Sequence, residues 1–336
     1  MNKKISLSVA LTLIVVTPLT LLSAERAENS NRLSIGPQFT FNYKANFQST
    51  ASNFNPGPAT GGANHTYDDG YVLVDASGNF GGLTTNWGYI NPTQVVGAGL
   101  ANGMEFRSIQ PSGSSSVEDD PQYGFEIIYQ RVLSALSETS PGIWGFQVGF
   151  SYTDLDLDGN DRGTTPVTID TYPLNGVLPP PAPYNGTFVG PGTLLGDTPV
   201  RTLGSAALIR DQKLSGHLFN FRLGPFAEWE VTPKLSVSAS AGLTLAPTKL
   251  EYDYSETVTL SSGPSFASSG HASTTKLLYG GYVDARLRYD FNESWGAYVG
   301  AQFQSLNSLQ QSAGGRSAKF DPGATIALSA GITWQF

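Results

Sequence analysis

The chain has 336 residues, a formal net charge of −8 and no cysteine. The missing cysteines exclude disulfides, thiolate metal sites, a cysteine nucleophile and lipoprotein acylation, and the acidic balance without a basic patch argues against a nucleic-acid partner. Only 14% of the residues are charged, 11% are aromatic and 38 are glycine, which is typical of an all-β protein with many turns rather than of a helical bundle.

The amino-terminal segment has the pattern of a secretory signal. Two lysines precede an apolar run over residues 5–16, and small residues end the segment at Ala24. A positive start, an apolar centre and a small-residue end mark a cleavable export signal. We therefore predict a signal peptide over 1–24, since the run is too short, and too interrupted at Pro18, for a membrane anchor helix.

Three segments of the amino-terminal half alternate apolar and polar residues, over 33–47, 123–133 and 143–152. In the third segment, for example, the apolar residues in phase with Trp144 stand opposite Gln147, Gly149 and Ser151. A period of two indicates a β-strand that has one apolar face.

The carboxy-terminal half continues this alternation in five segments, over 219–229, 235–245, 279–289, 295–304 and 327–336. The eight segments have the length of tilted membrane-spanning strands. We therefore predict an all-β fold, a transmembrane antiparallel up-and-down β-barrel of eight strands, in a barrel domain over 25–336. Ten or twelve strands stay open as an alternative, because 67–75 and 104–109 could add a hairpin to the wall.

The connections between these segments alternate between short and long. Short ones lie at 137–142, 231–234 and 290–294, and long ones at about 48–120, 156–213, 259–272 and 311–321. A barrel that starts and ends in the periplasm has its short turns on one rim and its long loops on the other. We therefore expect long external loops at about 48–120 and 156–213.

The last segment alternates up to an aromatic terminal residue. Its apolar positions are Leu328, Ala330, Ile332, Trp334 and Phe336. Together with the signal, the eight strands and the unequal connections, this ending resembles bacterial outer-membrane β-barrel proteins of the OmpA/OmpX type. The resemblance implies location in the bacterial outer membrane, contact with its lipid and lipopolysaccharide, and recognition of these five residues by the barrel-assembly machinery. We expect a monomer.

Aromatic residues near the strand ends are expected to form two interfacial girdles. They are Phe47, Tyr152, Trp229, Tyr289, Trp295 and Trp334. The charged residues of the opposite phase are expected to face the lumen; they are Lys44, Glu126, Arg222, Glu228, Asp284, Arg286, Arg288 and Asp290. Four basic and four acidic groups can be held there as paired charges that plug a narrow barrel. A conducting lumen is the alternative.

A row of aspartates follows the third segment in the sequence DLDLDGNDRG. Asp154, Asp156 and Asp158 match the first half of an EF-hand calcium loop, but Thr165 stands where that loop needs a glutamate. The row continues the outward phase of Tyr152, so we expect it at the external rim. There it could bind Ca²⁺ or Mg²⁺ at the level of lipid phosphates, or form a solvated extension of the strand. No other cofactor is expected.

The predicted function is that of a closed, non-enzymatic scaffold which displays acidic external loops for adhesion, ligand contact or envelope integrity. A small porin-like or apolar-solute channel is the first alternative, and it requires a wider, open lumen. A rim-located hydrolase, an omptin-like protease or a lipid A deacylase, is the second alternative. The candidate bases for it are His65, His217 and His271, but no matching motif surrounds them.

Overall fold

The computed structural model describes residues 30–50, 55–97, 102–109, 111, 113–118, 121–137, 142–260 and 265–336. The predicted signal segment 1–24 and most of the predicted turn 137–142 lie outside the described residues. Nearly all the regular structure is strand, and the helix in this part of the chain is a single 3₁₀ turn, η2 (Pro92–Gln94). No described helix has the length and apolar character needed to cross a membrane.

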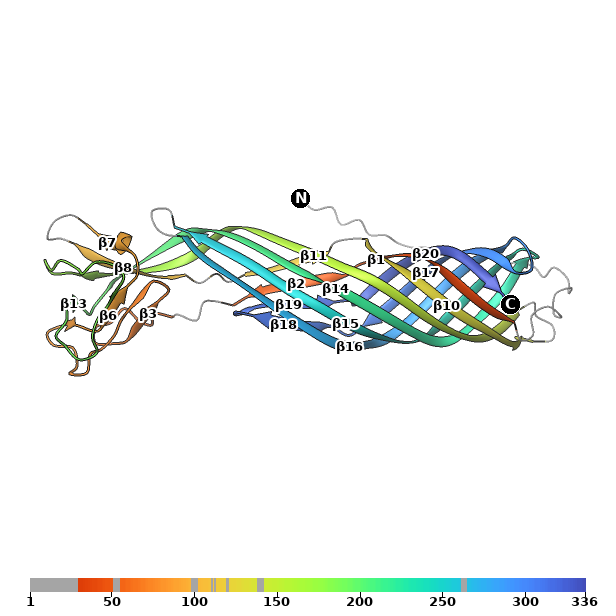
Figure 1. The fold of residues 1–336 in the computed structure, drawn as a ribbon, viewed down its shortest axis with the longest axis horizontal. Coiled ribbons are helices and arrows are strands. Elements are labelled where there is room, and N and C mark those ends of the chain that lie inside the picture. Colours follow the sequence, from red (N-terminus) through yellow and green to blue (C-terminus); the bar gives the residue numbers. More distant parts are fainter. Residues whose placement is uncertain are drawn as a thin grey trace.

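One end of the molecule is a closed ring of eight antiparallel strands (Figure 1). They are β1 (Asn31–Phe41), β10 (Gln122–Ala135), β11 (Gly142–Pro173), β14 (Val200–Thr232), β15 (Leu235–Thr259), β16 (Ser265–Asp290), β17 (Trp295–Leu306) and β20 (Ala324–Gln335). The hydrogen-bonded order is β10-β1-β20-β17-β16-β15-β14-β11, and β11 pairs with β10 to close the ring. Each predicted segment supplies one of these strands, so the antiparallel β-barrel prediction is confirmed.

Four neighbouring strands continue far beyond the ring. β11 has 32 residues, β14 has 33, β15 has 25 and β16 has 26, whereas β1 has 11. The predicted external loop over 156–213 is therefore mostly strand, because β11 runs to Pro173 and β14 starts at Val200. The predicted loop over 259–272 is shortened in the same way. The Asp and Gly residues in these stretches favour loops by composition. The alternation of apolar and polar residues nevertheless persists there, and the strands stay paired with their neighbours.

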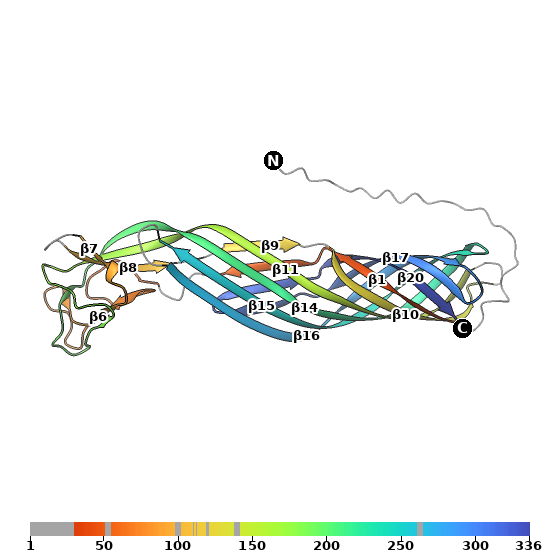
Figure 2. The same ribbon diagram turned by 45° about the horizontal axis from the view of Figure 1, so that its top comes forward.

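A second sheet lies opposite the long strands, with the order β18-β19-β2-β9. Its strands are β2 (Lys44–Ser49), β9 (Gly113–Glu118), β18 (Leu309–Ala313) and β19 (Arg316–Asp321). β18 lies beside β16 and β9 lies beside β11, so the two sheets enclose a common interior (Figure 2). We call this region the stalk; it comprises 44–49, 113–118, 155–169, 203–218, 246–260, 265–278 and 309–321.

The predicted strand 33–47 is in fact two strands. Asn42 has a φ of 68°, in the left-handed region that asparagine tolerates better than most residues. The chain leaves the ring at this point, and β2 pairs with β19 and β9 instead. Phe47, which we expected in an aromatic girdle, is therefore buried inside the stalk with 1% of its surface exposed.

Apolar side chains fill the stalk in two layers. The larger layer includes Phe47, Leu155, Leu157, Leu214, Leu250, Tyr252 and Phe320, all of them buried. The smaller layer, farther from the ring, consists of the stalk residues Val167, Ala206, Leu208, Val258 and Leu260 together with Ile109, from the segment that precedes β9. Each fully buried aliphatic or aromatic side chain contributes about 1.5–3 kcal/mol, so the stalk has a core like that of a water-soluble β-sandwich.

A small folded unit caps the far end of the stalk (Figure 1). We call it the head, residues 55–97, 102–109 and 174–199. Its strands are β3 (His65–Tyr67), β4 (Gly70–Val72), β5 (Leu83–Thr84), β6 (Trp87–Tyr89), β7 (Val95–Val96), β8 (Gly103–Ile109), β12 (Tyr184–Asn185) and β13 (Leu195–Gly196). β8 extends the wall beside the end of β11, but β3 and β4 belong to a separate sheet, so the ring keeps eight strands.

Candidate functional site

The outer face of the ring is apolar over a band that is limited by aromatic side chains. Exposed residues inside the band include Leu33, Ile35, Phe146, Val148, Phe221, Leu223, Leu243, Val283, Leu287 and Val299. Trp144, Trp229, Tyr289, Trp295 and Trp334 are exposed toward the short turns, and Tyr123, Phe219, Tyr279 and Phe303 are exposed toward the stalk, where Tyr152 is partly exposed. Such a surface fits a lipid bilayer with aromatic residues at its two interfaces. The protein is an outer-membrane β-barrel.

The apolar residues of the last strand all face outward, as predicted. Leu328, Ala330, Ile332, Trp334 and Phe336 are exposed, and the alternate residues point into the lumen. The last residue lies within the ring, because Phe336 exchanges backbone hydrogen bonds of 2.9 and 3.0 Å with Asn31 at the start of β1. Recognition of these residues by the assembly machinery stays a prediction.

The lumen near the short turns holds a cluster of paired charges. Glu228 accepts hydrogen bonds from Arg32 at 2.7 Å and from Arg288 at 3.1 Å. Arg288 also lies 3.1 Å from Asp290. These groups come from β1, β14 and β16, so the cluster ties three separate strands together across the lumen.

A second charged cluster fills the middle of the lumen. Glu126 on β10 accepts from Arg222 on β14 at 2.7 Å and lies 3.4 Å from Arg286 on β16. Arg286 also pairs with Asp284 at 2.9 Å, and Tyr298 donates its hydroxyl to Glu126 at 3.1 Å. Buried charges are tolerated when they are paired and hydrogen-bonded. Every charge in this cluster has an oppositely charged partner, although Nε and Nη1 of Arg222 have no hydrogen-bond partner.

Seven of the eight predicted lumen charges lie in these two clusters, but Lys44 does not. It lies after the turn at Asn42, on β2, where it pairs with Glu118 at 3.0 Å and is about half exposed. Arg32 takes the missing place, and the lumen still holds four basic and four acidic groups. The alternation signal contained Arg32, because it has the same phase as the inward residue Ser34.

The interior above the charged clusters is also filled. Asn220, Thr244 and Gln304 form a hydrogen-bonded group, and a cavity of about 10 Å³ near it has room for at most one water. The apolar layers of the stalk follow, and between them Glu256 pairs with Arg210 at 2.7 Å and with Arg316 at 2.6 Å. The described interior is therefore packed from the lumen to the head.

The predicted aspartate row lies on the outer face of β11, just beyond the membrane band. Asp156 and Asp158 contact Lys213 at 2.6 and 3.5 Å, and Asp154 lies 3.2 Å from His217. These carboxylates thus pair with basic groups of β14. Within the described ranges no group of three or more His, Cys, Asp or Glu side chains is arranged to hold a metal ion. Calcium or magnesium binding at the row stays a prediction.

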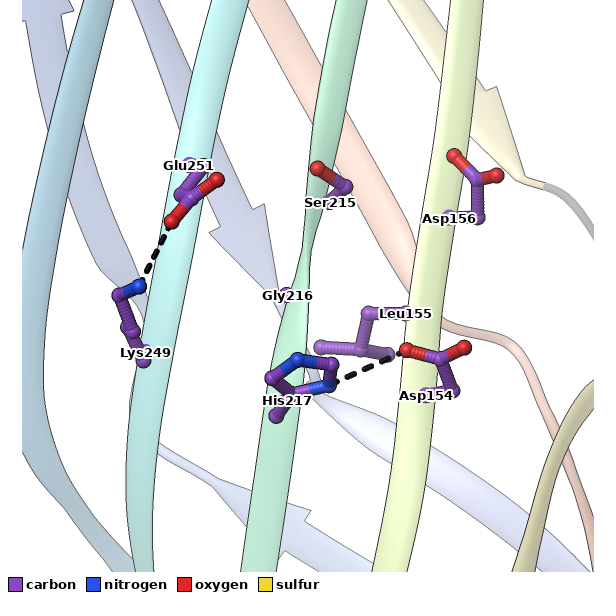
Figure 3. Close-up of a pocket in the computed structure, with 8 residues that line it drawn as sticks. All are labelled: Asp154, Leu155, Asp156, Ser215, Gly216, His217, Lys249 and Glu251. Atoms are coloured by element: carbon purple, nitrogen blue, oxygen red, sulfur yellow. Dashed lines mark ion pairs between the residues drawn. The ribbon is translucent and has the colours of Figure 1, made fainter.

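A groove of about 210 Å³ lies beside this row on the outer surface (Figure 3). Asp154 and Asp156 of β11 stand on one side, and Lys249 and Glu251 of β15 stand on the other. Gly216 of β14 lies between them, where a side chain would clash, because an added Cβ would come within 2.1 Å of a backbone oxygen. The groove is open to solvent and carries both signs of charge.

The three histidines lie apart and do not form a catalytic group. Both ring nitrogens of His65 contact backbone carbonyl oxygens, of Pro56 at 2.6 Å and of Thr60 at 2.9 Å. Both ring nitrogens are thus occupied by contacts with the backbone. His217 and His271 lie on the outer wall, on β14 and β16, where His271 pairs with Asp253 at 2.8 Å.

A buried polar clamp joins the head to the stalk. Asp170, at the end of β11, receives two hydrogen bonds of 2.7 Å from Arg201 of β14 and one of 2.7 Å from Tyr67 of β3. Tyr172 completes the group with a 2.7 Å contact to Tyr67. Burial, more than any neighbouring charge, raises the pKa of both tyrosines, so both keep their protons and serve as donors. No local sequence motif predicts this clamp.

A second buried carboxylate lies in the head itself. Asp69 accepts from the backbone amide of Arg107 at 2.7 Å and from its side chain at 3.2 Å. Burial raises the pKa of Asp69 to about 6, although the hydrogen bonds and charge of Arg107 oppose this shift. The head therefore contains a group that changes its charge near neutral pH.

No protein-family model matches the chain, and no curated protein matches its sequence. Among solved structures, the chain is similar to the attachment invasion locus protein Ail of Yersinia pestis, at 9% identity and a TM-score of 0.29, covering 92% of this chain and 99% of Ail. It is also similar to the outer membrane protease OmpT of Escherichia coli, at 10% identity and a TM-score of 0.31, covering 94% and 99%. Similarities this low transfer no activity.

Proposed function

We propose that the protein is a closed, non-enzymatic membrane scaffold that holds the head away from the outer membrane, where the head contacts an extracellular ligand or surface. The observation that carries this proposal is the packed interior. Paired charges fill the lumen, and two apolar layers fill the stalk above it. A molecule built in this way is suited to support and display rather than to transport.

The dimensions of the long strands support a display function. Thr171, at the head, lies nineteen positions after Tyr152, which stands at the membrane boundary. At roughly 3.3 Å per residue the strand covers about 60 Å between these two residues. The wall is continuous along this length, because β11 and β14 pair from Gly142 to Thr171. The head is thus carried on a stiff support.

The composition of the head supports a role in contact. Residues 174–196 contain no charged side chain, although the whole chain is acidic. Phe80, Leu178, Phe188 and Val189 are all more than half exposed. Interfaces between proteins are enriched in aromatic residues and depleted of charged ones at their centres. Such an uncharged surface with exposed apolar side chains is suited to contact with another molecule.

Two measurements test the proposal. In planar bilayers we expect no steady single-channel steps from the purified protein, and such steps would overturn the closed scaffold in favour of a porin-like channel.

The second measurement tests display of the head. In one headless variant, both 55–109 and 174–199 are replaced by short Gly-Ser linkers. Cells carrying the headless variant and cells carrying the unmodified protein are compared for binding to host cells and matrix proteins. Loss of binding without loss of the folded barrel supports the proposal. Equal binding by the headless variant and the unmodified protein overturns the proposal.

A further inference from the structure

The groove on the outer wall lies at the boundary between apolar and charged surface. Tyr152 and Phe219 face each other across β11 and β14 in the last aromatic row. The next outward-facing pair in the same register is Asp154 and His217, which line the groove. The polar heads of membrane lipids occupy this level, because aromatic girdles lie at the membrane–water interface.

The floor of the groove is kept open by the backbone. Gly216 has a φ of 155°, and an added Cβ would come within 2.1 Å of the carbonyl oxygen of Lys249. Any larger residue would disturb the pairing of β14 with β15 that forms this floor. The resulting volume of about 210 Å³ is far larger than the roughly 15 Å³ that one water needs.

The groove is lined by both acidic and basic groups, and Glu251 stands beside Lys249 on the β15 side. Asp154 and Asp156 provide carboxylates from β11, while Lys249 provides an ammonium group from β15 and His217 an imidazole from β14 (Figure 3). Lys249 lies directly opposite His217 in the strand register, so these two nitrogen groups approach the same space.

These groups are available to a ligand. Their present partners are neighbours on the same surface, with Lys249 2.7 Å from Glu251, His217 3.2 Å from Asp154 and Asp156 2.6 Å from Lys213. All six side chains in these pairs are at least 40% exposed. Exposed ion pairs contribute little to stability, so a ligand that carries both charges can replace them without loss to the fold.

We propose that this groove binds the head of a zwitterionic membrane amphiphile, one that carries an ammonium group and a phosphate. The ammonium group lies against Asp154 and Asp156, and the phosphate lies against Lys249 and His217. The acyl chains lie along the apolar wall below Tyr152 and Phe219. The site is on the wall of the barrel and is independent of the function proposed for the head.

Native mass spectrometry of the full protein in a nonionic detergent tests this site. The probes are dihexanoyl phosphatidylethanolamine, which is zwitterionic, and dihexanoyl phosphatidylglycerol, which is anionic. We expect the zwitterionic lipid to bind about tenfold more tightly, and we expect Lys249→Gln and Asp156→Asn each to weaken it about five- to tenfold, since each removes one charged contact.

The control variant is Arg162→Gln, which removes an exposed pair of 2.7 Å with Asp211 on the same two strands, farther from the membrane. It is expected to bind like the unmodified protein. Equal binding of the two lipids, or unchanged binding in Lys249→Gln and Asp156→Asn, overturns the proposal. Stronger binding of the anionic lipid that is lost only in Lys249→Gln also overturns it, because the site would then be a simple phosphate site.

Discussion

The membrane ring and the stalk use the same strands with opposite chemistry. On β14, Asn220 and Arg222 point inward within the ring, while Phe219 and Phe221 face the lipid. A few residues farther along, Leu214 and Leu218 point inward, while Lys213 and His217 face water. The period of two is unchanged, but the chemistry of the two faces is exchanged at Leu218.

The exchange follows from the medium outside each region. In the bilayer the outer face must be apolar, so the inner face can hold charges, provided that they are paired and hydrogen-bonded. In water the outer face is polar, and folding then needs an apolar interior to bury. The medium outside a strand wall therefore determines whether the side chains on its inner face are polar or apolar.

Removing a charge from the lumen is expected to have the largest effect. Glu126→Ala leaves Arg222 and Arg286 without their shared carboxylate, and uncompensated buried charge costs about 3–5 kcal/mol. Urea unfolding from lipid vesicles, followed by tryptophan fluorescence, measures the change in unfolding free energy. The double variant Glu126→Leu with Arg222→Met should lose less unfolding free energy than Glu126→Ala alone. A loss below about 1 kcal/mol in Glu126→Ala would show that the lumen charges do not hold the ring together.

The second largest effect is expected from a cavity in the core of the stalk, and the loss of stability should be confined to the stalk. Leu214→Ala removes a side chain that is 1% exposed, and such changes cost about 2–5 kcal/mol. Hydrogen exchange should rise in the outer parts of β14 and β15, while β1 and β20 keep their protection. Asp211→Ala, at an exposed position on the same strand, is the matched control. Exchange that rises equally in β1 and β20 would mean that the two regions unfold as one unit.

Acidification should stabilise the head. The folded pKa of Asp69, about 6, is above the ordinary value of 3.8, so the folded head binds the proton more tightly than the unfolded head. This contribution is complete below pH 3.8 and is lost as the pH rises through about 6; two pKa units correspond to at most about 3 kcal/mol. Proteolysis of the head should be slower at pH 5 than at pH 7. Asp69→Asn should flatten this difference, and an unchanged difference would assign it to another group.

The smallest effect is expected on the outer face of the stalk. Lys213→Gln removes the exposed pairs with Asp156 and Asp158, and pairs of this kind contribute about 0–1 kcal/mol. Thermal unfolding should shift by no more than a few degrees. A larger shift would show that this surface, rather than the buried layers, holds the stalk together.

The sequence predicted the ring well because every ring strand meets lipid on one side. Residues such as Ile35, Phe146 and Val283 stand in phase over ten or more positions, and the strand length matches the membrane. The stalk was not predicted. Past Leu218 the apolar residues change sides and the outward residues become Asp, Lys and His, which favour loops by composition.

The errors at single residues have equally local causes. The assignment of Lys44 to the lumen assumed an uninterrupted strand, and the left-handed conformation of Asn42 ended that strand first. The head could not be predicted as a unit, because its core joins Tyr67, Trp87, Phe106 and Tyr172 from segments that are far apart in the chain. The clamp of Asp170 and Arg201 depends on the same long-range pairing.

The continuity of β11 and β14 has a mechanical consequence. Both strands run from the ring to the head without a break, so a pull on the head is transmitted along two covalent backbones into the membrane. The neighbouring strands β10 and β15 resist such a pull through hydrogen bonds that lie across the direction of force. These bonds must yield together rather than one after another. The molecule is therefore strongest along its long axis, the direction in which the proposed extracellular contact of the head would load it.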